Sequence, residues 1–246
     1  MNIVVLASGG GAEKNTRFPP NLLLEINGKL LLEHFLDKLE FKNDFNLIFV
    51  IDYDDVKNHR LDKVISLSAP HSQISVANSP TKGALCSFML TVDDLDFDKE
   101  LLILNSNEIL NIKYQDPLDQ FYVNNADAGA VIFNSVKPIY SYVNIDDKKF
   151  VTFASEKNPI SKNATAGFYW YKETSEFLVC AEDTILKNDS HNDLFYICPA
   201  FNQMILRKKS IFTYKIDEES YIPIKSSLQK ERLVLQNQLN FNHENS

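Results

Sequence analysis

The sequence predicts an α/β fold in which a mainly parallel sheet is covered by helices on both faces. The first observation is a short apolar run, Ile3–Leu6, which stops at a glycine-rich segment and is followed by an amphipathic stretch at 30–39. The second is that apolar runs of strand length alternate with helical patterns along the rest of the chain. This alternation is typical of sheets whose connecting helices pack on the two faces.

Further apolar runs have the length and composition of strands. They are Leu47–Ile51, Ile74–Ala77, Leu101–Leu104, Ala130–Phe133, Phe168–Tyr171 and Ile211–Ile216. The spacing of apolar residues predicts helices at 84–92, 117–122, 177–185 and 201–205. Asp116 stands where the N-cap of the second of these helices is expected. The segment 140–153 alternates on either side of Asp146-Asp147, which predicts a hairpin.

Length and composition indicate one globular domain, residues 1–224, followed by a C-terminal helix and a frayed polar tail, residues 225–246. A net charge of −8 disfavours a nucleic-acid partner, and no apolar stretch has the length of a membrane span. Cys86, Cys180 and Cys198 are widely spaced in apolar surroundings, which predicts buried thiols in a reducing compartment. Because no basic segment precedes the first strand, we expect a cytoplasmic protein.

The glycine-rich segment is the first candidate for binding chemistry. It reads Ala7-Ser8-Gly9-Gly10-Gly11-Ala12. Unobstructed N–H groups in such a loop can cradle an anion such as phosphate. The motif is neither Gly-x-Gly-x-x-Gly nor a Walker A loop, so an ordinary glycine turn explains it equally well when it is taken alone. The histidines show no ligand spacing, and we assign no residue to a metal.

Four segments occur in the order found in one protein family. They read LASGGG with PNLLLEINGK at 6–11 and 20–29, TKGA at 81–84, LLILNSN at 101–107, and EKNPIS, ATAGFY and FYICPAFN at 156–161, 164–169 and 195–202. In this respect the chain resembles the sugar-phosphate nucleotidylyltransferases, in particular the bacterial branch of capsule and surface-polysaccharide gene clusters. The resemblance covers nearly the whole chain, and its last segment is the most specific.

The resemblance implies a single Rossmann-like αβα sandwich with a mainly parallel mixed sheet, of the nucleotidyltransferase or GT-A-like type. It also implies a reaction between a nucleoside triphosphate and a sugar 1-phosphate that yields a nucleotide sugar and pyrophosphate. In that reaction the protein aligns two anions and neutralises charge on the α- and β-phosphates. Family members do so with loop amides, an arginine, a lysine and Mg²⁺ held by aspartate, while a Glu-Lys lysine grips the sugar phosphate.

Matched to these motifs, the chain has three groups of candidate site residues. The nucleotide-binding residues are Ala7, Ser8, Gly9, Gly10, Gly11, Thr81, Lys82, Gly83, Ala84 and Asn105. The residues for the second ligand, a phosphorylated small molecule, are Glu156, Lys157 and Gly167. The catalytic positions are Asn21, Asn107 and Lys157.

The chain departs from the family pattern at the charged catalytic positions. The arginine position is Gly11, the lysine position is Asn21 and the metal-binding aspartate position is Asn107. A second metal carboxylate is expected at 221–227, where there is no aspartate. Mg²⁺ is therefore only a weakly supported cofactor, because it prefers ionised oxygen ligands. Glu108 is expected to face away from the site unless the strand has already ended. Lys14 and Arg17 remain alternative sources of positive charge in the first loop.

Two function classes stay open. One is a nucleotidyltransferase with weak turnover in surface-polysaccharide precursor synthesis, which uses rearranged charges. The other is an inactive homologue that binds a nucleoside triphosphate or nucleotide sugar and acts as a regulatory or partner subunit. A homo-oligomer or a complex with an active paralogue would fit the second class. The retained segments mainly bind ligands, whereas the missing groups mainly stabilise a transition state.

Overall fold

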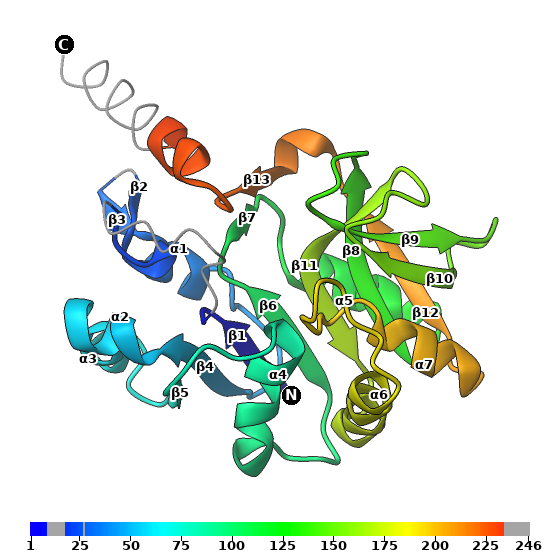
Figure 1. The fold of residues 1–246 in the computed structure, drawn as a ribbon, viewed down its shortest axis with the longest axis horizontal. Coiled ribbons are helices and arrows are strands. Elements are labelled where there is room, and N and C mark those ends of the chain that lie inside the picture. The colour runs from blue at the N-terminus through cyan, green and yellow to red at the C-terminus, as the bar shows by residue number, and fades with distance from the viewer. Residues whose placement is uncertain (9–17, 27, 234–246) are drawn as a thin grey trace.

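The computed structural model describes residues 1–8, 18–26 and 28–233, and among them nine strands form one mixed sheet (Figure 1). The central strands run parallel to one another and are β1 (Asn2–Leu6), β4 (Asn46–Asp52), β5 (Gln73–Ala77) and β6 (Leu101–Asn105). The sheet continues through β11 (Asn163–Tyr171), β9 (Ser141–Ile145), β10 (Val151–Glu156), β8 (Ala128–Asn134) and β12 (Ile211–Lys215). β11 is antiparallel to β6, and β12 is parallel to β8.

Alternation along the strands builds two separate cores, one on each face of the sheet. In β1, Ile3 and Val5 face one core, while Val4 and Leu6 face the other, as the two-residue period of a strand requires. The first core is covered by α1 (Leu31–Leu36), α3 (Leu61–Ser68) and α5 (Gln115–Val123). The second is covered by α4 (Ala84–Phe88), α6 (Thr174–Leu186) and α7 (Ala200–Leu206). The expected αβα sandwich is confirmed.

Most expected elements lie within a few residues of their sequence-based bounds. The hairpin is formed by β9 and β10, and Asp146 accepts the turn hydrogen bond from the Lys149 backbone N–H. The expectation for Asp116 was wrong, because α5 begins one residue earlier and Tyr114 is its N-cap. Asp116 lies in the first turn of that helix, where a carboxylate still interacts favourably with the helix dipole. The helices α2 (Tyr53–His59) and α3 were not expected from the sequence.

Two short strand pairs lie beside the main sheet. β2 (Glu25–Ile26) pairs with β3 (Lys29–Leu30), and β7 (Glu108–Leu110) pairs with β13 (Tyr221–Pro223). Residues 227–233 are helical, and the tail at 234–246 lies outside the described residues. The pairing of β13 with β7 therefore returns the C-terminal part of the chain to the end of β6 (Figure 1).

The remaining features bear on the expected environment of the protein. The three cysteine thiols are free; two are buried, but Cys86 is only half-buried, so the expectation of burial was wrong for that residue. In the described part of the chain, no helix combines the length and apolarity that a membrane crossing needs. The division between residues 224 and 225 stays a prediction.

Candidate active site

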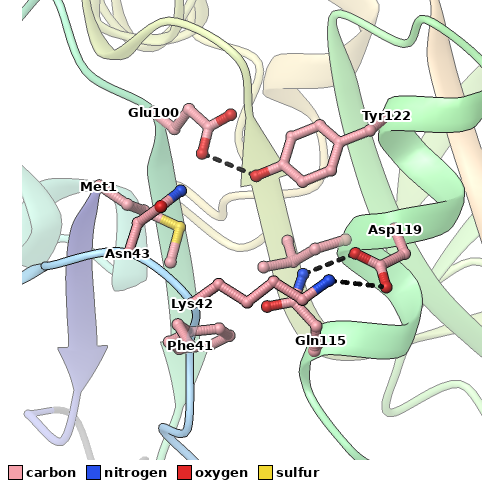
Figure 2. A pocket seen from close by; sticks show the side chains of 9 residues that line it. Met1, Phe41, Lys42, Asn43, Glu100, Gln115, Asp119 and Tyr122 are labelled. Carbon is pink, nitrogen blue, oxygen red and sulfur yellow. Dashed lines mark hydrogen bonds and ion pairs between the residues drawn. The ribbon is translucent and has the colours of Figure 1, made fainter.

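A pocket lies at the amino edge of the sheet, where β1 and β6 begin, and Figure 2 shows its lining. Its volume is about 240 Å³, and its polar side chains pair with one another. Tyr122 Oη donates to Glu100 Oε2 at 2.8 Å, and Gln115 Nε2 donates to Asp119 Oδ1 at 2.7 Å. Ligand sites in sheets of this kind lie at the opposite, carboxyl edge. We therefore assign no ligand to this pocket.

At the carboxyl edge, the ends of β1, β5 and β6 bring three of the sequence-predicted segments together. Leu6 lies opposite Asn105 in the register of β1 and β6, and the Ser106 backbone N–H donates to the Leu6 carbonyl at 3.1 Å. Ala7 and Ser8 follow β1 directly. The nucleotide-binding residues Gly9, Gly10 and Gly11, with Lys14 and Arg17, lie outside the described residues.

Two polar side chains beside the first loop are buried without a partner. Ser8 Oγ and Asn21 Oδ1 have no hydrogen-bond partner in the part of the chain that the structure describes. Asn21 is the first residue of the short 3₁₀ helix η1 (Asn21–Leu23). Because buried polar atoms are nearly always paired, these two atoms mark a place where a ligand could supply the missing hydrogen bonds.

The Thr81–Ala84 loop is held by backbone contacts with the Phe195 segment. The Phe195 N–H donates to the Lys82 carbonyl at 2.8 Å, and the Leu85 N–H donates to the Phe195 carbonyl at 3.1 Å. Gly83 has φ +100°, and a Cβ atom there would overlap the Phe195 carbonyl oxygen. Glycine is therefore required at position 83 by both conformation and space. Lys82 is exposed, so its side chain is free to approach a ligand.

The expected residues for the second ligand lie at the end of β10. Glu156 is the last residue of this strand, and Lys157 turns the chain in a left-handed conformation with φ +51°. Lys157 Nζ donates to Tyr196 Oη at 2.7 Å and lies 4.8 Å from the centroid of that ring. Tyr196 directly follows Phe195, so one segment contacts both the Thr81–Ala84 loop and Lys157.

Glu156 is a buried carboxyl group with a perturbed pKa. Burial raises its pKa from about 4.5 to about 7, partly offset by the Ser141 hydroxyl and by the charges of Lys157 and Lys225. Ser141 Oγ donates to Glu156 Oε2 at 2.5 Å. Burial also raises the pKa of the neighbouring Cys198 thiol well above its usual range, so this thiol stays protonated. The group that titrates near neutral pH at this edge is therefore a carboxyl group.

Gly167 lies opposite the end of β6, one residue before the Phe168–Leu104 pair of β11 and β6. Its φ of +64° interrupts the extended strand, and a Cβ atom at this position would overlap Glu108 Oε1 and lie 2.7 Å from Asn105 Nδ2. The absence of a side chain at position 167 thus makes room for the Glu108 carboxylate.

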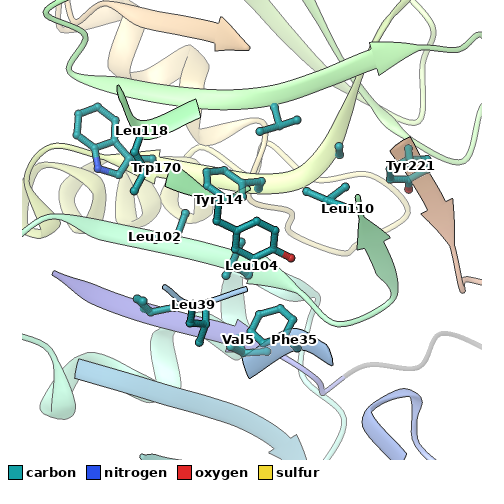
Figure 3. Close-up of a cluster of buried hydrophobic side chains, with 14 of the residues drawn as sticks. Val5, Phe35, Leu39, Leu102, Leu104, Leu110, Tyr114, Leu118, Trp170 and Tyr221 are labelled. Carbon is teal, nitrogen blue, oxygen red and sulfur yellow. The ribbon is translucent and has the colours of Figure 1, made fainter. Parts of the chain in front are cut away.

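We call the group around this carboxylate the cation corner; it consists of Asn105, Asn107, Glu108, Tyr221 and Lys225. β6 ends at Asn105, so Glu108 does not continue its alternation, and its 2%-exposed side chain turns toward the site. Asn105 Nδ2 donates to Glu108 Oε1 at 3.0 Å, and Tyr221 Oη donates to Oε2 at 2.5 Å. Figure 3 shows Tyr221 on β13 beside Leu110 of β7.

Lys225 completes the cation corner from the C-terminal segment. Its Nζ lies 2.9 Å from Glu108 Oε2 and donates to Asn107 Oδ1 at 3.1 Å. The Ile224 backbone N–H donates to the Asn107 carbonyl at 2.8 Å, which fixes the two segments against each other. A positive charge from the segment 221–227, where the family resemblance implies a second metal-binding carboxylate, therefore lies beside Asn107, the position of the first.

The residues of the cation corner do not fit Mg²⁺. Asn107 offers a neutral amide oxygen, and the Glu108 carboxylate already accepts from Asn105, Tyr221 and Lys225. Within residues 1–8, 18–26 and 28–233, no three His, Cys, Asp or Glu side chains are grouped closely enough to hold a metal ion. A hard divalent cation would also have to displace the Lys225 ammonium.

The fold of this chain has counterparts among solved protein structures. It is similar to a nucleoside-diphosphate-sugar pyrophosphorylase from Vibrio cholerae RC9, with a TM-score of 0.79 and 17% identity over 95% of this chain and 99% of that one. The chain has the nucleotidyltransferase fold. A putative glucose-1-phosphate thymidylyltransferase from Bacillus anthracis, in complex with a sucrose, has a TM-score of 0.72 and 15% identity over 94% of this chain and 93% of that one. No protein-family model and no curated protein sequence matches the chain.

In this nucleotidyltransferase fold, the described sequence-predicted residues line one edge of the sheet. Lys225 and Tyr221 were not predicted as site residues. The family resemblance implied a carboxylate at 221–227, and neither a lysine nor a tyrosine met that expectation. Tyr196 was not predicted either, although this residue lies inside a motif that was recognised. The reservation about Glu108 depended on where β6 ends, and the strand ends early enough for the side chain to turn inward.

Proposed function

We propose that this chain binds a nucleotide or nucleotide sugar at the carboxyl edge of β1, β5 and β6, with weak or absent turnover. The observation that carries the proposal is the Lys225 ammonium between Asn107 and Glu108. The family reaction needs strong charge neutralisation at the phosphates, and a lysine paired with a buried carboxylate supplies less of it than a divalent ion. Of the two function classes left open by the sequence, the homologue that binds a nucleotide or nucleotide sugar and acts as a regulatory or partner subunit is therefore favoured.

The binding part of the proposal is supported by groups that are positioned but not used. Among the described residues, the buried atoms Ser8 Oγ and Asn21 Oδ1 have no hydrogen-bond partner. The Thr81–Ala84 loop is locked by the Phe195 backbone, which suits a surface that receives a base. Lys157 donates to Tyr196 beside the end of β10, where an anionic second ligand would be expected. The two structural neighbours are named for nucleotide-sugar chemistry.

The low-turnover part follows from the missing charges. Loss of one preorganised stabilising group typically lowers a rate by a factor of about 10² to 10³. Asn21 and Asn107 are neutral at two of the positions concerned. A role in surface-polysaccharide precursor synthesis, as a regulatory subunit or as the partner of an active paralogue, agrees with binding that survives without fast chemistry.

Two measurements test this function. Calorimetry against nucleoside triphosphates, nucleoside diphosphates and nucleotide sugars of each common base should give saturable heat with at least one base. Pyrophosphate release from triphosphate and sugar 1-phosphate mixtures with Mg²⁺ should stay far below that of an active nucleotidylyltransferase assayed in parallel. Absence of heat with every ligand would refute the binding site, and pyrophosphate release at the rate of the parallel enzyme would refute the low turnover.

A further inference from the structure

Lys225 is held in an unusual position for a lysine near the end of a chain. Its side chain is 21% exposed, and its ammonium contacts Asn107 and Glu108, which lie far away in the sequence. Its own backbone N–H donates to Gln229 Oε1 at 2.7 Å, which caps the start of the helical segment 227–233. Both ends of the residue are therefore fixed.

The ammonium has a donor left for a ligand. A lysine ammonium carries three N–H donors, and the described residues take up two of them, through Glu108 Oε2 and Asn107 Oδ1. Asn107 follows the end of β6, at the edge that also carries Ala7 and Ser8. The ammonium with its remaining donor therefore lies at the carboxyl edge of the sheet, beside the residue that follows β6.

The charge balance of the cation corner is the same as that of a metal site. Two carboxylates with one divalent ion sum to zero, and so do the neutral Asn107, the carboxylate of Glu108 and the ammonium of Lys225. The Lys225 ammonium balances the charge of the Glu108 carboxylate, and the neutral Asn107 adds no charge. Removal of the ammonium alone would leave the buried Glu108 carboxylate unbalanced.

We propose that the Lys225 ammonium is a built-in cation that contacts a phosphate of the bound nucleotide, so that nucleotide binding in this protein does not require a divalent metal ion. The inference rests on the proposed function. It adds the identity of the phosphate-binding group and the independence from metal. Lys225 is positioned for this role by Glu108, which is itself held by Asn105 and Tyr221.

Calorimetry with the full chain tests this inference, using the nucleoside diphosphates of each common base in EDTA and again with MgCl₂. The wild-type protein is expected to bind the preferred diphosphate with equal affinity in the two conditions. Lys225→Gln is expected to weaken that binding by about tenfold to hundredfold, as for a lost hydrogen bond to a charged group. Lys148→Ala, which removes an exposed lysine at the β9–β10 turn, is the control and should bind like the wild type.

The outcomes separate the inference from the function on which it rests. Absence of binding in both conditions refutes the proposed function. Binding that is lost in EDTA refutes the built-in cation and leaves the proposed function standing. Because Lys225→Gln alone leaves Glu108 unbalanced, the double variant Glu108→Gln/Lys225→Gln provides a charge-neutral, hydrogen-bonding alternative. If circular dichroism shows that this variant is folded, and if it binds the diphosphate as the wild type does, the inference is wrong.

A gain of metal binding supplies a second readout. Asn107→Asp/Lys225→Asp removes the ammonium and adds two carboxylates beside Glu108, which creates the hard oxygen set that Mn²⁺ and Mg²⁺ prefer. Titration with Mn²⁺, followed by the loss of the free-ion signal in electron paramagnetic resonance, should detect binding to this variant and not to the wild type. Equal Mn²⁺ binding by both proteins would show that the ammonium does not replace a metal.

Discussion

The Thr81–Ala84 loop and the cation corner are two halves of one edge that are built in different ways. The loop is held by hydrogen bonds between its own backbone and the Phe195 backbone. The cation corner is held by side chains, with Glu108 at its centre and donors from three separate segments around it. A backbone-built half keeps its shape when most side chains change, whereas a side-chain-built half can change its chemistry without a change of fold.

This difference explains why the fold is that of a nucleotidyltransferase while the corner is not that of a metal site. In the loop, the positive φ of residue 83 and its close approach to Phe195 are both satisfied by glycine. In the corner, Lys225 balances the charge of Glu108 and donates to Asn107, although Asn107 lies 118 residues away in the sequence. The binding surface and the charge-neutralising machinery are therefore independent to a large degree, and they can be broken separately.

The largest effect is expected from Gly83→Ala. The new Cβ atom would overlap the Phe195 carbonyl oxygen and lie 2.7 Å from the Phe195 nitrogen, at a φ of +100° that alanine rarely adopts. Backbone strain and overpacking together should lower the free energy of unfolding by about 3–5 kcal/mol, measured by urea denaturation. Gly28→Ala is the matched control, because its φ is +74° but no described residue other than its chain neighbours lies within 4 Å of the added atom. It should cost about 1–2 kcal/mol, and equal losses in the two variants would contradict the backbone-built loop.

Gly167→Ala should have a slightly smaller effect, because the obstacle is a side chain. The added Cβ atom would overlap Glu108 Oε1, and the expected loss of unfolding free energy is about 2–4 kcal/mol. In the double variant Gly167→Ala/Glu108→Ala the overlap with Glu108 is removed and only the contact with Asn105 Nδ2 remains, so the combined loss should be smaller than the sum of the two single losses by about 1–3 kcal/mol. Strict additivity would show that Glu108 does not occupy the space beside Gly167.

The sequence singled out Gly83 and Gly167 at this edge, and the structure shows a physical reason for glycine at both positions. Glycine at 83 and 167 records a local requirement for positive φ and close approach, and such a requirement can be recognised in a single segment. The cation corner could not be recognised in that way, since Asn107, Glu108 and Lys225 meet only after β7 has paired with β13. The residue at which β6 ends also determines the face toward which the Glu108 side chain points. Patterns of apolar residues define the ends of strands poorly.

The next effect concerns the pH dependence of stability that Glu156 imposes. Its pKa is raised from about 4.5 in the unfolded chain to about 7 in the folded one, so the folded state binds its proton more tightly. Between these pH values the native protein holds more protons than the unfolded chain, and stability therefore falls as pH rises. The contribution is fully present below pH 4.5 and is lost as pH rises through 7, by at most about 3 kcal/mol.

Comparison of the wild type with Glu156→Gln isolates this contribution. The charged groups around Glu156 are Lys157 and Lys225, and the neutral Cys198 and Tyr169 lie near it. Urea denaturation at several pH values should show a wild-type stability that declines relative to the variant between pH 4.5 and 7. Parallel curves for the two proteins would show that the carboxyl group is not desolvated at the end of β10.

The smallest effect separates the two ligands and concerns Lys157. Its ammonium contacts Tyr196, at a left-handed residue that follows β10. If it contacts an anionic or sugar portion of a nucleotide sugar, Lys157→Ala should weaken binding of the nucleotide sugar by about 1.5–3 kcal/mol. The same substitution should leave binding of the corresponding nucleoside diphosphate nearly unchanged, because the diphosphate lacks the portion that Lys157 is expected to contact. Lys162→Ala, an exposed lysine of the following loop, is the control for lost charge. The affinity for both ligands is measured by calorimetry. If Lys157→Ala weakens binding of the two ligands equally, or weakens binding of neither, Lys157 does not contact the second ligand. The edge would then recognise a nucleotide alone.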